Sequence, residues 1–112
     1  MNKKFQSPVY LENILDALDK ISGLVQLTPI VLSPSLTNLN DAPVYLKLEH
    51  QQTTGSFKLR GATHAVESLS DAQKSRGVVG VSNGNHGRGL AYAAKQAGVR
   101  CIVCMSSLVP LN

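Results

Sequence analysis

The chain has 112 residues beginning with Met, of which 43% are hydrophobic and 16% charged, and its formal net charge is +4. This composition is typical of a small soluble globular protein and excludes a disordered one. The basic residues are scattered and form no run with interleaved aromatics, which argues against nucleic-acid binding. No stretch reaches the roughly 18 apolar residues of a membrane span and no signal peptide is visible, so we expect a cytoplasmic protein with no membrane partner.

A helix is predicted over residues 9–22. Ser7 is a suitable N-cap, Pro8 suits the first helical position, and Gly23 is a natural stop. One face of this helix collects apolar residues at spacings of three and four. Those residues are Leu11, Ile14, Leu15, Leu18 and Ile21.

Residues 24–40 are predicted to form an extended connection over the surface, because prolines recur in and just after this segment. Alternating side chains predict a strand over 44–49, and a polar loop follows over 51–55. Ser56 is then a suitable N-cap for a helix over 57–69. The expected buried side of this helix consists of Leu59, Ala62, Ala65, Val66 and Leu69.

A βαβ unit is predicted after a short helix or turn over 71–76. A strand over 78–81 leads through a glycine-rich turn into a helix over 86–96, and a buried strand covers 99–105. A strand–helix–strand unit makes a right-handed crossover, so the two strands should be parallel. The fold class is therefore α/β.

Two cysteines, Cys101 and Cys104, stand in a C-x-x-C spacing on the last predicted strand. A redox pair or half of a zinc site is one interpretation. A zinc site needs about four ligands, however, and the chain has no second cysteine pair. Residues three apart on a strand face opposite sides, so we expect the thiols to diverge and to act as small core hydrophobes in a reducing cytosol. No metal is expected.

The first candidate for chemistry is Lys58, in the run Ser-Phe-Lys-Leu-Arg-Gly-Ala over 56–62. It lies in the first turn of a predicted helix, where the positive end of the helix dipole disfavours an ammonium ion and favours the neutral amine. A neutral amine suits Schiff-base chemistry. A surface lysine on an amphipathic helix would explain the same position without any chemistry.

The second candidate is the run Ser-Asn-Gly-Asn-His-Gly-Arg-Gly over 82–89. Its glycines let the backbone approach a ligand, and the helix that follows offers free N–H groups to a carboxylate or phosphate. The spacing matches neither the dinucleotide fingerprint nor a Walker A loop. A structural strand-to-helix turn is the alternative, and His86 alone suits a helix cap or a core position as well as a base.

Together the two runs resemble the fold-type II, or tryptophan-synthase-β-like, pyridoxal-phosphate enzymes, and in particular the serine/threonine dehydratases. Thr28-Pro29 and the run Leu-Lys-Leu-Glu over 46–49 fit the same family, so the resemblance covers the chain from about residue 10 to its end. Within the family, the stretch from Cys104-Met105-Ser106 to Val109-Pro110 is similar to hydroxyectoine-utilisation dehydratases.

The resemblance implies roles for individual residues. Lys58 would form the Schiff base with pyridoxal 5'-phosphate and later act as the base at the substrate α-carbon, with Phe57 against the pyridine ring. Asn85 would bind the phenolic oxygen of the cofactor. The loop that receives the substrate carboxylate would consist of Ser82, Gly84, Asn85 and His86. Asn83 departs from the small residue usual at its position, which puts the substrate fit in doubt.

The resemblance also implies that this is the N-terminal part of a longer enzyme. Residues 1–50 would contribute a helix and a strand to the large domain, and residues 51–112 would supply the lysine loop and the βαβ unit of the small domain. The glycine-rich phosphate loop and the partner of the pyridine nitrogen are absent from the sequence. We therefore expect this chain alone to be inactive, and the full-length enzyme to be a homo-oligomer.

The implied function is a lyase that removes water and then ammonia from a β-hydroxy amino acid, either threonine- or serine-like or derived from hydroxyectoine. A racemase of the same family is one alternative. A catalytically inactive remnant or binding module is another, and ammonia release separates it from a lyase. A redox C-x-x-C protein would instead lose its activity when both thiols are blocked.

Overall fold

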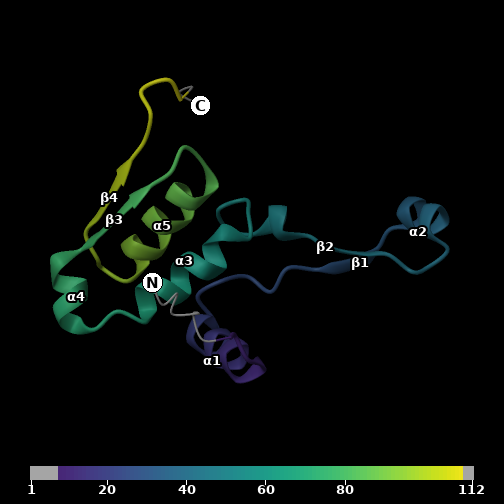
Figure 1. Cartoon of the computed structure of the whole chain (residues 1–112), viewed down its shortest axis with the longest axis horizontal. Helices are drawn as coiled ribbons and strands as arrows, with labels where there is room; N and C mark the ends of the chain where they lie inside the picture. The colour runs from purple at the N-terminus through teal and green to yellow at the C-terminus, as the bar shows by residue number, and fades with distance from the viewer. Residues whose placement is uncertain (1–7, 110–112) are drawn as a thin grey trace, which may run out of the picture.

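Two adjacent helices, α3 (Lys58–Glu67) and α5 (Asn85–Gln96), form the centre of the computed structural model, which describes residues 8–109 (Figure 1). The core lies where they meet and contains Ala62, Val66, Leu90, Ala93, Ala94 and Val99. Half of these side chains are alanines, so the two helices approach closely. Leu59 and Val66 are fully buried, as predicted for this side of α3.

The predicted βαβ unit is confirmed. Strand β3 (Val78–Val81) pairs in parallel with β4 (Cys101–Cys104), and α5 connects them. Helix α4 (Asp71–Arg76) precedes β3, and the Ser70 hydroxyl caps it by accepting a hydrogen bond from the Gln73 N–H at 3.4 Å. Of the short helix or turn predicted over 71–76, the helix is the one that forms.

The prediction of a buried last strand over 99–105 is wrong. Strand β4 is shorter than expected and only half covered, because α5 packs on one face of the two-stranded sheet (Figure 1). Cys101 is half-buried on the covered face, and Cys104 is exposed, so Cys104 is not a core residue in this chain. The alternation of burial along β4 confirms that the two thiols point to opposite sides. Val79 and Val81 are 69% and 80% exposed on the open face.

The first helix, α1 (Leu11–Ile21), begins later than predicted. Its N-cap is Tyr10, whose N–H donates to Asn13 Oδ1 at 2.9 Å, and Pro8 precedes the helix. Ser7, the predicted cap, lies outside the described residues. Only Ile21 of the apolar face is buried. The other members of that face, Leu11, Ile14, Leu15 and Leu18, are exposed.

The extended connection predicted over 24–40 is wrong. This segment contains strand β1 (Ile30–Leu32) and helix α2 (Pro34–Asn40). The Ser33 hydroxyl accepts from the Leu36 N–H at 3.5 Å, and Pro34 occupies the first helical turn, so the segment has its own helix start.

Strand β1 pairs antiparallel with β2 (Tyr45–Lys47), which confirms a shorter version of the predicted strand. The polar loop begins as a turn of 3-10 helix, η1 (Glu49–Gln51). The two strands and α2 form an arm that projects away from α3 and α5 (Figure 1). The radius of gyration is accordingly 17.3 Å, whereas a compact domain of this length has about 13 Å. Within residues 8–109, no helix is both long and apolar enough to cross a membrane.

Candidate active site

Lys58 lies in the first turn of α3, as predicted; it is the first residue of the helix and its side chain is exposed. A turn at Gly55, with φ of +74°, delivers the chain into this helix, and the Gly55 N–H donates to the Gln52 carbonyl at 2.7 Å. The Lys58 Nζ lies 5.0 Å from the centroid of the Phe57 ring. Amine and aromatic ring are therefore presented together at the start of the helix.

Ser56 does not act as the predicted N-cap. The N-cap position is held by Phe57, and no side chain caps the helix there. Ser56 is buried instead, and its hydroxyl has no hydrogen-bond partner among the described residues. The Thr54 hydroxyl is also buried without a hydrogen-bond partner among the described residues. The loop that carries the lysine thus buries two hydroxyl groups whose hydrogen bonds are not made within residues 8–109.

The loop after β3 is organised by Ser82. Its Oγ accepts from the N–H of Gly87 at 2.9 Å and from the N–H of Gly84 at 3.2 Å, so it caps the start of α5. The Asn83 side chain turns toward the segment after β4, where its Oδ1 accepts from the Ser106 N–H at 2.9 Å. Asn85 is the first residue of α5 and is exposed.

Two hollows flank α5 and divide the predicted site residues between them. One, of about 300 Å³, has Phe57, Lys58 and His86 on its wall, with Leu90 beneath. Ala65 is exposed at this hollow and does not lie in the core, which corrects its predicted burial. The other hollow, of about 340 Å³, is lined by Ser82, Asn83 and Gly84 among others. The structure therefore brings His86 to the lysine, while Asn85 lines neither hollow.

Gly89 sets the distance between the two sequence runs. A Cβ atom at this position would lie 3.3 Å from the backbone N of Leu59 and 3.3 Å from the carbonyl carbon and oxygen of Lys58. The backbone of α5 thus packs directly on the first turn of α3. The sequence suggested that these glycines admit a ligand, but Gly89 admits the lysine-bearing backbone itself. A Cβ at Gly87 would likewise lie 2.9 Å from Val103 Cγ1.

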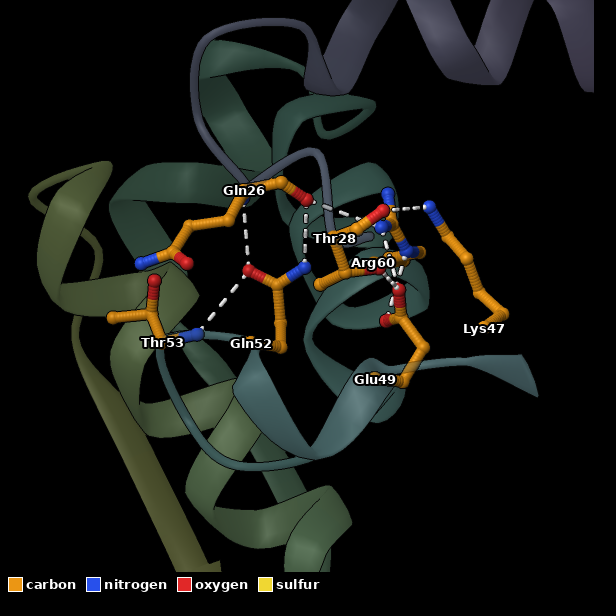
Figure 2. Close-up of polar contacts among 7 residues, drawn as sticks. All are labelled: Gln26, Thr28, Lys47, Glu49, Gln52, Thr53 and Arg60. Atoms are coloured by element: carbon orange, nitrogen blue, oxygen red, sulfur yellow. Dashed lines mark hydrogen bonds and ion pairs between the residues drawn. The ribbon is translucent and has the colours of Figure 1, made fainter. Parts of the chain in front are cut away.

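A cluster of polar residues, missed from the sequence, joins the segment before β1 to β2, η1 and α3 (Figure 2). We call it the Glu49 cluster; it consists of Gln26, Thr28, Lys47, Glu49, Gln52 and Arg60. Arg60 donates to Glu49 through Nε at 3.0 Å and through Nη2 at 2.6 Å. Thr28 Oγ1 donates to Glu49 Oε1 at 2.5 Å, and Lys47 Nζ donates to the Thr28 carbonyl at 2.6 Å.

The Glu49 carboxylate is held in its charged form. The hydrogen bonds from the Arg60 guanidinium are the main cause, and they lower the pKa of Glu49 from 4.5 to about 2. Burial opposes this change, while the Thr28 hydroxyl and the charges of Arg60 and Lys47 add to it. The only hint of this cluster in the sequence is the pair of opposite charges, Glu49 and Arg60, on either side of the loop that leads to Lys58. No group of three or more His, Cys, Asp or Glu residues within 8–109 could hold a metal ion.

Comparison with known proteins gives a consistent result. The chain is 54% identical over 106 residues to a protein of Sinorhizobium fredii that carries the provisional name threonine dehydratase. It is 41% identical over 104 residues to the catabolic L-threonine dehydratase of Staphylococcus aureus. These matches cover 95% and 92% of this chain but 32% and 30% of the relatives. The chain therefore spans about a third of the length of the curated relatives it matches.

Among solved structures, serine racemase from Dictyostelium discoideum matches with a TM-score of 0.86 at 39% identity, over 91% of this chain and 34% of that one. This likeness supports the α/β fold as a part of a larger fold-type II domain. The family described as "Pyridoxal-phosphate dependent enzyme" matches residues 21–111. The chain belongs to this family of pyridoxal-phosphate-dependent enzymes.

Proposed function

We propose that this chain is the N-terminal, cofactor-binding-lysine part of a dehydratase that removes water and then ammonia from a β-hydroxy amino acid. The observation that carries the proposal is the hollow that is lined by both Lys58 from α3 and His86 from α5. Relatives named threonine dehydratase, L-threonine ammonia-lyase and β-hydroxyaspartate dehydratase support this class of reaction.

The residues at the hollow fit pyridoxal 5'-phosphate. An exposed primary amine stands beside an aromatic ring on a largely apolar wall, and about 300 Å³ lies within the usual range of small-molecule sites. When bound, the cofactor supplies an aldehyde that takes up an amine and a ring that withdraws electrons from the substrate α-carbon. The buried hydroxyls of Thr54 and Ser56, which have no partner within residues 8–109, lie in the same loop and keep hydrogen-bonding capacity there.

Individual residues of the chain are assigned separate roles in binding the cofactor and the substrate. Lys58 holds the cofactor through its Nζ and, once released, removes the substrate α-proton with the same atom. Helix α5 begins at Asn85, so the N–H groups of Asn85 and His86 have no acceptor within the helix and can bind the substrate carboxylate, while the Gly87 N–H donates to Ser82. Ser82 and Gly84 shape this loop, and we assign the phenolic oxygen of the cofactor to Asn85 and the ring face to Phe57.

A racemase is the second candidate, favoured by the likeness to serine racemase. The two differ in the fate of the substrate: a dehydratase yields a keto acid and ammonia, and a racemase returns the amino acid with inverted configuration. A substrate derived from hydroxyectoine remains a proposal that rests on the sequence of the stretch 104–110 alone. An inactive remnant predicts neither product.

We further propose the assignment of residues 1–50 to the large domain and 51–112 to the small domain. The separate projection of the β1–β2 arm from the α3–α5 core supports this division. A homo-oligomeric full-length enzyme is also proposed, since the apolar face of α1 is open. A cytoplasmic location stays a prediction from the sequence.

Borohydride trapping tests the role of Lys58. The chain is incubated with pyridoxal phosphate and reduced, and labelled lysines are located by peptide mass spectrometry. We expect label chiefly at Lys58, and much less at Lys95, which is also exposed but lies in the last turn of α5. Lys58→Ala should remove the selective label and Lys95→Ala should not. Equal labelling of the two lysines would refute the assignment.

A further inference from the structure

The loop that leads to Lys58, residues 52–57 (the lysine loop), is anchored on both sides by the Glu49 cluster. After the loop, Arg60 lies two residues beyond Lys58 in α3, and its guanidinium binds both oxygens of Glu49. The two side chains are 27% and 16% exposed, so water screens this pair only in part. A two-point contact between guanidinium and carboxylate fixes orientation as well as distance.

Before the loop, Gln52 makes the matching anchor. Its side chain is buried, and its amide pairs with the backbone of Gln26 in both directions: Nε2 donates to the Gln26 carbonyl at 3.0 Å, and Oε1 accepts from the Gln26 N–H at 2.8 Å. The same Oε1 accepts from the Thr53 N–H at 3.2 Å. Arg60 Nη2 also donates to the Gln26 carbonyl, at 3.1 Å, so the two anchors share one acceptor.

Between these anchors the loop has little support of its own. Thr54 and Ser56 leave their hydroxyls unpaired within the described residues, and Gly55 adopts a positive φ. On the opposite side of Lys58, Gly89 of α5 packs against the backbone of Lys58 and Leu59, and the Leu59 side chain is fully buried. The location of the lysine Cα therefore depends on the two anchors as well as on the packing of Lys58 and Leu59 against α5.

We infer that Glu49, Arg60 and Gln52 are positioning residues that hold the backbone of Lys58 against α5, so that its amine faces the hollow shared with His86. The inference rests on the proposed function in so far as Lys58 holds the cofactor. None of the three residues lines that hollow. They act through the backbone of residues 52–60.

The test compares two substitutions on the same chain. Glu49→Gln keeps the shape of the side chain and removes the charge that Arg60 binds. Glu67→Gln is the matched control, because Glu67 pairs with Lys74 at 3.3 Å, is 27% exposed and lies at the far end of α3. Two quantities are measured for each: amide hydrogen exchange over residues 53–57, and selective borohydride trapping of pyridoxal phosphate at Lys58 relative to Lys95.

For Glu49→Gln we expect exchange over 53–57 to accelerate and trapping at Lys58 to fall, each by about tenfold, as loss of a charged hydrogen-bonded pair implies. Arg60→Lys keeps the charge but loses the two-point contact, so it should fall between wild type and Glu49→Gln. Glu67→Gln should leave both quantities within about twofold of wild type, as a more peripheral ion pair implies.

The outcomes separate this inference from the proposed function. If wild-type Lys58 is trapped no better than Lys95, the proposed function fails, and exchange over 53–57 still decides whether the cluster holds the loop. If Glu49→Gln leaves that exchange unchanged, the positioning role is overturned even where trapping is selective. Equal effects of Glu49→Gln and Glu67→Gln would also overturn it, because they would reflect general destabilisation.

Discussion

Substitution of Gly89 by alanine tests the close contact between the two central helices. Two effects oppose each other. Alanine in a helix interior is favoured over glycine by about 1 kcal/mol. The new Cβ, however, would lie 3.3 Å from the backbone of Lys58 and Leu59, so α5 and α3 must separate by a few tenths of an ångström. Such overpacking costs about 1–3 kcal/mol. We expect a net loss of about 1 kcal/mol in the free energy of unfolding.

Gly61→Ala is the matched control for this substitution. Gly61 lies within α3, and a Cβ added there would meet nothing within 4 Å, so only the favourable helix effect remains. Urea titration followed by circular dichroism should therefore show Gly61→Ala stabilised and Gly89→Ala destabilised relative to wild type. Equal stabilisation of both variants would refute the argument that the backbone of α5 rests on the lysine-bearing turn.

Two further predictions concern stability. The pKa of Glu49 is lowered from 4.5 to about 2 on folding. Its ionised carboxylate therefore contributes about 3 kcal/mol to the free energy of unfolding above pH 4.5, and this contribution is lost as the pH falls toward 2. Unfolding measured as a function of acid pH should show this loss in wild type and not in Glu49→Gln. Gly77→Ala should destabilise the chain more than Gly23→Ala by about 1–3 kcal/mol. Both glycines have positive φ, but of the two only Gly77 would bring a Cβ against backbone, 2.6 Å from the Arg100 carbonyl oxygen. Similar thermal midpoints for the two variants would contradict this.

Local patterns were sufficient to predict the βαβ unit. The strand over 78–81, the helix after it and the parallel partner each follow from hydrophobic spacing and glycine boundaries within a short stretch. The burial of the last strand was overestimated, because a continuous apolar run does not reveal whether one face or both are covered. Lys58 at a helix start was also predictable from its immediate neighbours.

The errors in the first half of the chain have two physical sources. The same Ser-Pro pair occurs at 7–8 and at 33–34, and the prediction of a helix start used only the first, although the second does begin a helix. Prolines in 24–40 favoured an extended reading, yet a proline in the first turn is compatible with a helix. The Glu49 cluster could not be predicted at all, because its contacts join residues far apart in the chain, such as Thr28 with Glu49 and Gln26 with Gln52.

The bare face of the β3–β4 sheet favours self-association of the chain in solution. Val79, Val81 and Ile102 present apolar surface on a short sheet whose outer edges are open. Such a surface promotes self-association, and the net charge of +4 is the main force that opposes it at neutral pH. Added salt screens that repulsion and leaves the apolar attraction in place. The solubility limit of the chain should therefore fall as ionic strength rises, and low-salt buffers are the right medium for handling it.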